Sequence, residues 1–81
     1  MEIKVLGSGC AKCGATKKLV AEVVEEMGVD ANIEPVTDLM EIIKYDVMST
    51  PGVVIDGEVV SSGKVPSRDE VRTWLQERNV G

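Results

Sequence analysis

Cys10 and Cys13 are the two cysteines of this 81-residue chain, and two residues separate them. An apolar segment that predicts a strand, residues 2–6, precedes the pair, and a pattern typical of an amphipathic helix follows it. At the first turn of a helix this spacing brings two sulfurs close enough for a small disulfide ring, whose oxidised and reduced forms can be close in free energy. The pair therefore predicts a redox carrier rather than a structural staple.

The predicted start of the helix assigns a role to each sulfur. Cys10 is expected at the N-cap, where unpaired backbone N–H groups and the helix dipole favour a thiolate, so its pKa should lie below the usual value of about 8.5. Cys13, one turn deeper and more shielded, would stay a thiol until a mixed disulfide forms and would then attack it. We therefore predict Cys10 as the nucleophile and Cys13 as the resolving thiol.

The charges of this helix run against its macrodipole, since lysines occupy the first half and glutamates the second. Helix stability therefore does not explain their placement. We hypothesise that Lys12, between the cysteines, strengthens the positive potential at Cys10. A solvated charged face is the alternative, and the simpler one for the other lysines. The charged residues are Lys12, Lys17, Lys18, Glu22, Glu25 and Glu26.

Composition excludes several classes of function. The net charge of −5 and the scarcity of aromatic residues argue against nucleic acid as a partner, because phosphate binding needs clustered Lys and Arg. The chain has no histidine, so no Ser-His-Asp triad can form. No apolar run approaches the roughly 20 residues that span a bilayer, and the N-terminus lacks a secretory signal pattern. We expect a single domain in the cytoplasm with no membrane partner.

The hydrophobic pattern predicts the element order βαβαββα. Strands are expected at residues 2–6, 30–36, 53–55 and 58–60, the last two joined by a tight Asp56-Gly57 turn. Pro35 cannot donate to a sheet ladder, which places the second strand at a sheet edge or the proline at a strand end. Helices are expected from Cys10 to the stop signal at Gly28, from Asp38 to about Asp46, and after the Ser67-x-x-Glu70 capping box.

Each predicted helix has an apolar face that should cover the sheet. The first helix offers Ala15, Leu19, Val20, Val23, Val24 and Met27. The second offers Leu39, Ile42 and Ile43, and the last offers Val71, Trp74 and Leu75.

The element order, with C-x-x-C after the first strand and Thr50-Pro51 before the third, resembles a minimal thioredoxin fold. The segments GSGCAKC at 7–13 and TPGVVIDG at 50–57 resemble the small thioredoxin-like redox-active disulfide proteins of archaea and bacteria. This resemblance covers nearly the whole chain. It implies one thioredoxin-like domain over residues 1–81, an α/β fold with a four-stranded mixed sheet and helices on both faces.

The resemblance also implies roles for individual residues. Pro51 is expected to be a cis-proline beside Cys10, and the backbone of Thr50 is expected to pair with an extended segment of the substrate. A trans bond at the start of a strand is the alternative. Thioredoxins also keep a buried carboxylate beneath the disulfide to move protons. Lys4 is the candidate for that side here, and a lysine extended to water is the alternative.

These observations predict a thiol:disulfide oxidoreductase that carries electrons in its dithiol. We expect it to reduce disulfides in proteins or small molecules, to be re-reduced by a separate flavin-dependent or other reductase, and to act as a monomer without a bound cofactor. A metal-binding module with zinc, copper or an iron–sulfur cluster shared by two chains is one alternative. A noncatalytic redox-sensing adaptor is another, and a structural disulfide is a third.

Overall fold

The computed structural model describes residues 1–7, 11–47 and 49–78. The predicted order βαβαββα is confirmed, and the predicted element ends agree to within about two residues. The elements are β1 (Glu2–Leu6), α1 (Ala11–Met27), β2 (Asn32–Val36), α2 (Leu39–Lys44), β3 (Gly52–Ile55), β4 (Glu58–Ser62) and α3 (Arg68–Arg78).

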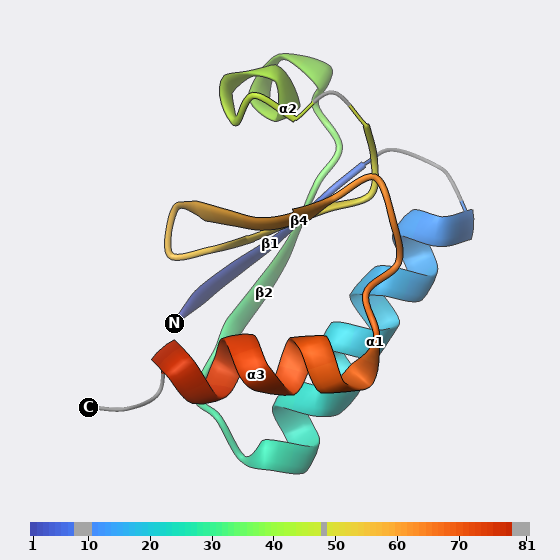
Figure 1. The fold of residues 1–81 in the computed structure, drawn as a ribbon. Coiled ribbons are helices and arrows are strands. Elements are labelled where there is room, and N and C mark those ends of the chain that lie inside the picture. The colour runs from blue at the N-terminus through green and yellow to red at the C-terminus, as the bar shows by residue number, and fades with distance from the viewer. Residues whose placement is uncertain (8–10, 48, 79–81) are drawn as a thin grey trace.

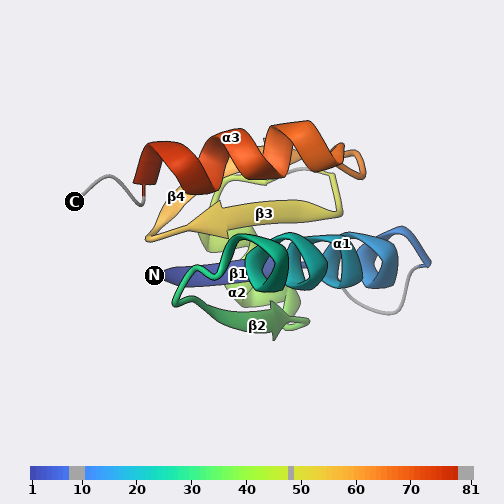
Figure 2. The same ribbon diagram turned by 90° about the horizontal axis from the view of Figure 1, so that it is seen from below.

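The four strands form one mixed sheet in the order β2-β1-β3-β4. β1 pairs with β2 in parallel and with β3 antiparallel, and β3 pairs with β4 antiparallel. α1 and α3 cover one face of this sheet and α2 covers the other, so helices lie on both faces as the resemblance implies (Figures 1 and 2). β2 is an edge strand, which confirms the prediction drawn from Pro35.

The larger core lies between the sheet and the pair α1 and α3. Alternation along the central strands turns Ile3, Val53 and Ile55 toward these helices, because successive strand residues point to opposite faces. The predicted helix faces are largely confirmed, although Ala15 is exposed rather than buried. The helical side chains buried in this core are Val20, Val23, Val24, Val71 and Leu75, with Leu19, Met27 and Trp74 packed at its margin.

The smaller core lies under α2, where Leu6 and Val54 meet Ile42 and Val47. The prediction that all of Leu39, Ile42 and Ile43 face inward is wrong. Only Ile42 is buried, while Leu39 and Ile43 are 68% and 56% exposed. α2 has six residues, fewer than two turns, and it rests on the sheet along the side of Ile42 alone.

Local hydrogen bonds mark the C-terminal end of α1 and the start of α3, as the sequence predicts. The N–H of Gly28 donates to the carbonyl of Glu25 and that of Val29 to the carbonyl of Val24, which is the Schellman pattern, with Gly28 at φ +67°. The capping box is also present, because the N–H of Ser67 donates to Glu70 Oε1 at 3.1 Å and the N–H of Glu70 donates to Ser67 Oγ at 3.2 Å.

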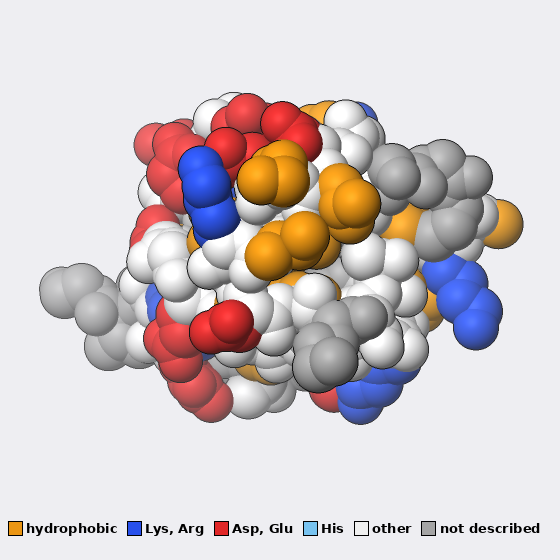
Figure 3. All heavy atoms as spheres, turned by 90° about the horizontal axis from the view of Figure 1, so that it is seen from above, with side chains coloured by type: hydrophobic (Ala, Val, Ile, Leu, Met, Phe, Trp, Pro, Cys, Tyr) orange, Lys and Arg blue, Asp and Glu red, His pale blue; other side chains and the backbone are white. Residues whose placement is uncertain are grey.

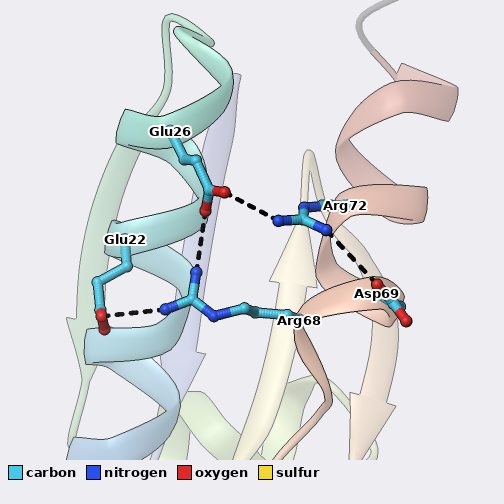
Figure 4. Close-up of polar contacts among 5 residues, drawn as sticks. All are labelled: Glu22, Glu26, Arg68, Asp69 and Arg72. Carbon is cyan, nitrogen blue, oxygen red and sulfur yellow. Dashed lines mark hydrogen bonds and ion pairs between the residues drawn. The ribbon is translucent and has the colours of Figure 1, made fainter.

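Ion pairs join the C-terminal half of α1 to the first turns of α3 (Figure 4). Glu26 pairs with Arg68 at 2.9 Å and with Arg72 at 2.8 Å, and Glu22 pairs with Arg68 at 3.4 Å. Arg72 also reaches Asp69 at 3.6 Å. Two of the glutamates that run against the helix dipole are therefore held by a neighbouring helix. This role is not visible in the sequence, because residues some 40 positions apart meet only in the folded chain.

Candidate functional site

Cys13 is the third residue of α1, and its side chain is only 7% exposed. The predicted shielding of this sulfur is therefore confirmed. Cys13 is disulfide-bonded in this structure and carries no free thiol. Cys10 precedes Ala11, the first residue of α1, in the sequence but lies outside the described residues, so its predicted accessibility and role as nucleophile stay predictions.

Gly7 brings three distant segments together around this sulfur. Its N–H donates to the carbonyl of Val36 at 2.9 Å, which extends the pairing of β1 with β2 by one residue. Its φ of +147° is a conformation that side chains rarely adopt. A β-carbon on Gly7 would overlap Sγ of Cys13 and would lie 3.4 Å from Cβ of Thr50. The end of β1, the first turn of α1 and the segment before β3 therefore converge here.

The Thr50-Pro51 segment lies on the same side of Gly7 as Cys13, because one β-carbon built on Gly7 would meet both Sγ of Cys13 and Cβ of Thr50. Thr50 is exposed, Pro51 is fully buried, and the peptide bond between them is cis. The carbonyl of Pro51 accepts a hydrogen bond of 2.9 Å from the N–H of Gly63, directly after β4. A β-carbon on Gly63 would lie 3.2 Å from Cβ of Ser49, so the end of β4 also contacts this segment. The substrate-binding roles of Thr50 and Pro51 stay predictions.

Lys12 occupies the second position of α1, and its side chain is exposed. Its backbone carbonyl accepts a hydrogen bond of 2.8 Å from Oγ1 of Thr16, a fully buried residue one turn further along. This bond satisfies the buried hydroxyl within the helix. The hypothesis that the charge of Lys12 acts on Cys10 stays a prediction.

Lys4 lies on the α2 side of β1, on the opposite face from Ile3 and α1. Its Nζ donates a hydrogen bond of 3.3 Å to the hydroxyl of Tyr45 and lies 6.0 Å from the centre of that ring. The hydrogen bond with Tyr45 raises the pKa of Lys4, with smaller contributions from the charges of Glu34 and Glu2. Lys4 therefore stays cationic at neutral pH. Both its position and its charge argue against a role in proton transfer beneath the disulfide.

The described part of the chain contains neither a side-chain cluster that could hold a metal ion nor a helix that could cross a membrane. No three side chains of His, Cys, Asp or Glu gather there in a way that could hold a metal ion. None of the helices described there has both the length and the hydrophobicity needed to cross a membrane. The candidate site among the described residues consists of Cys13, Gly7 and the Thr50-Pro51 segment, which lie close together.

Known proteins resemble this chain over most of its length. A family model described as a thioredoxin domain matches residues 1–76. A thioredoxin of Methanocaldococcus jannaschii is 45% identical over 74 residues, which cover 91% of this chain and 85% of that protein. A thioredoxin of Methanothermobacter thermautotrophicus is 35% identical over 75 residues, which cover 93% of this chain and 97% of that protein. The matched region includes both cysteines and the Thr50-Pro51 segment.

Proposed function

This chain belongs to the thioredoxin family and is a thiol:disulfide oxidoreductase, and we propose that Cys10 is its nucleophile and Cys13 its resolving thiol. The observation that carries these assignments is the position of Cys13, which is shielded at the first turn of α1 against Gly7. A shielded thiol one turn into a helix suits the second step of disulfide exchange, while the residue before the helix suits the first.

The proposed reaction transfers two electrons and two protons to the substrate. The Cys10 thiolate attacks one sulfur of the substrate disulfide, which forms a mixed disulfide and releases one substrate thiolate. Cys13 loses its proton and attacks the Cys10 sulfur, which forms the Cys10–Cys13 disulfide and releases the second substrate thiolate. The two product thiolates take up protons from solvent. A separate reductase then returns two electrons and two protons to the protein dithiol.

We assign supporting roles to three further residues. The backbone of Thr50 would pair with an extended strand of the substrate, since Thr50 is exposed next to the shielded sulfur. Pro51 lacks an N–H, so it leaves that side of the disulfide open to a substrate. Lys12 would add positive potential at Cys10 and so favour the thiolate. We expect the protein to act in a reducing compartment such as the cytoplasm, where dithiols persist.

A trapping experiment with 5,5′-dithiobis(2-nitrobenzoate) tests the two cysteine roles. The Cys13→Ser variant should react through Cys10 and keep a stable mixed disulfide with thionitrobenzoate, which mass spectrometry detects. The wild-type protein should release that group as Cys13 closes the intramolecular disulfide. The Cys10→Ser variant should react much more slowly, because a shielded thiol is a poor nucleophile. Equal reaction rates in the two variants would contradict the assignment and favour a passive redox sensor.

Metal analysis distinguishes the dithiol carrier from a metal-binding module. A dithiol carrier purified without oxygen should contain no stoichiometric metal, and its thiols should titrate fully with the same reagent. A metal-binding module would retain zinc, copper or iron through thiolate ligands, and the bound metal would protect both cysteines from the reagent.

A further inference from the structure

Large hydrophobic side chains stand exposed on α2, on the face of the sheet opposite α1. Leu39, Met40 and Ile43 are 68%, 67% and 56% exposed. Within the described residues, Val59 and Val65 are the other large hydrophobic side chains with high exposure, each at 37%. Figure 3 shows the hydrophobic group over α2, with acidic side chains along part of its border and a basic side chain beside them. Single exposed apolar residues are ordinary, but three on a six-residue helix form a patch.

This patch contains a hollow of about 530 Å³, lined by Leu39, Ile43, Asp46 and Val47. Three of its four lining residues are apolar, and the single polar one is acidic. A hollow of this chemistry and size can hold one apolar side chain of another protein. The surrounding apolar side chains would exclude water from that contact.

The hollow lies beside the segment that reaches Cys13. Val47, its buried lining residue, contacts Gly52, because a β-carbon on Gly52 would lie 3.4 Å from Cγ1 of Val47. Gly52 directly follows Pro51 in the chain. Thr50 is three residues from Val47, so their Cα atoms are at most about 11 Å apart. A protein whose disulfide reaches the Thr50 region can therefore also cover the hollow.

The charge at the hollow indicates which kind of partner side chain would lie beside the partner's apolar one. Glu41 is already paired with Lys44 at 3.1 Å. Asp46 is exposed and forms no ion pair with any residue that the structure describes. Its backbone N–H donates to the carbonyl of Ile43 at 3.0 Å, which holds it at the rim of the hollow. A lysine or arginine of a partner would complement Asp46, and the net charge of −5 would attract a basic protein at long range.

We propose that the α2 hollow receives an apolar side chain of a disulfide-bearing substrate protein, with a lysine or arginine of that protein beside Asp46. This proposal rests on the proposed function, and it adds a recognition surface away from the cysteines. Substrates with an apolar residue next to a basic one should therefore react faster than small disulfides of the same intrinsic reactivity.

Two synthetic peptides test this recognition. Each carries one cysteine in a mixed disulfide with thionitrobenzoate, joined by a Gly-Ser linker to either Leu-Lys or Ser-Glu. The second-order rate constant for the reaction with reduced protein is followed by thionitrobenzoate release in single-turnover experiments. The wild-type protein should react about tenfold faster with the Leu-Lys peptide, the factor expected when one apolar side chain is partly buried.

Variants of exposed residues assign the effect to the hollow. Ile43→Ser should remove most of this tenfold preference, and Leu39→Ser should act in the same way. Asp46→Asn should lower the rate constant for the Leu-Lys peptide about threefold, because an exposed ion pair is weak. The effect should be smaller at high salt, which screens the pair. Asparagine suits this position because Asp46 has φ +58°, a conformation that asparagine tolerates. Val59→Ser is the matched control on β4 and should leave the preference unchanged.

The outcomes separate the recognition surface from the redox function. Reaction with 5,5′-dithiobis(2-nitrobenzoate) should proceed at the wild-type rate in all four variants. The proposed recognition surface would be overturned if the wild-type protein reacted equally fast with the two peptides. It would also be overturned if Ile43→Ser and Leu39→Ser kept the preference unchanged. Neither result would affect the redox function. Loss of reaction with the small disulfide in the wild-type protein would overturn the proposed function itself. A wild-type dimer that Ile43→Ser dissociates in sedimentation equilibrium would identify a second copy as the occupant and overturn the proposal.

Discussion

The backbone of Gly7 packs against Cys13 so closely that a β-carbon at position 7 would overlap Sγ of that cysteine. Gly7 also has φ +147°, which disfavours any other residue there. Gly7, the residue directly after β1, is thus constrained in two independent ways. The close contact limits where Sγ of Cys13 can lie, and the φ limits which residue can occupy position 7.

Gly7→Ala should destabilise the protein by about 2 kcal/mol and slow disulfide exchange. The new methyl group must displace Cys13, and the backbone of the alanine must adopt a strained φ. Urea unfolding measures the stability, and thionitrobenzoate release measures the exchange. Gly14→Ala is the matched control, since a β-carbon there has no neighbour within 4 Å. That change should stabilise α1 by about 1 kcal/mol. Equal stability of the Gly7→Ala and wild-type proteins would contradict the proposed close contact.

The stability contributed by Glu70 should depend on pH. The hydrogen bond from the N–H of Ser67, with a further contribution from Lys64, lowers the pKa of Glu70 below 4.5. Folding therefore favours the carboxylate, so its stabilisation is fully present above pH 4.5 and is lost as the pH falls through the lowered pKa. Glu70→Gln, which keeps an acceptor for Ser67, should be less stable than wild type at neutral pH. The difference in urea unfolding should shrink at acid pH, and a constant difference would contradict this linkage.

The ion pairs between α1 and α3 should contribute modestly to stability. Glu26→Gln removes its pairs with Arg68 and Arg72 and should lower the free energy of unfolding by up to about 1 kcal/mol, since these side chains are partly exposed. The loss should diminish at high salt. Glu25→Gln is the matched control, because Glu25 forms no ion pair with the described residues. The same loss in both variants would show that helix charge, and not pairing with α3, is responsible.

Lys4→Met should leave the pH dependence of disulfide exchange unchanged. Lys4 lies on the face of the sheet that α2 covers and is hydrogen-bonded to Tyr45. Its raised pKa keeps it charged throughout the pH range of the assay. The pH profile of the reaction with 5,5′-dithiobis(2-nitrobenzoate) measures this directly. A displaced pH profile in Lys4→Met would show that this cation influences the cysteines despite its position.

Local sequence signals predicted most of the fold. Gly28, the Ser67-Glu70 capping box and the Asp56-Gly57 turn each act through hydrogen bonds or backbone angles within a few residues. Hydrophobic spacing likewise identified the buried face of each long helix. Periodicity failed for Leu39 and Ile43, because a pattern shows that residues share a side of a helix but not whether another element covers that side.

The sequence alone determined the element order, the cysteine spacing and the resemblance that identified the redox chemistry, because these depend on neighbours along the chain. Tertiary structure decided that Gly7 touches Cys13, that Glu26 meets Arg68, that Lys4 faces α2, and that the α2 patch lies open beside Val47. Each of these relationships joins residues from different elements. They depend on the order of the strands and on which helix covers each face of the sheet. Both are decided only when the whole sheet assembles and the helices pack on it.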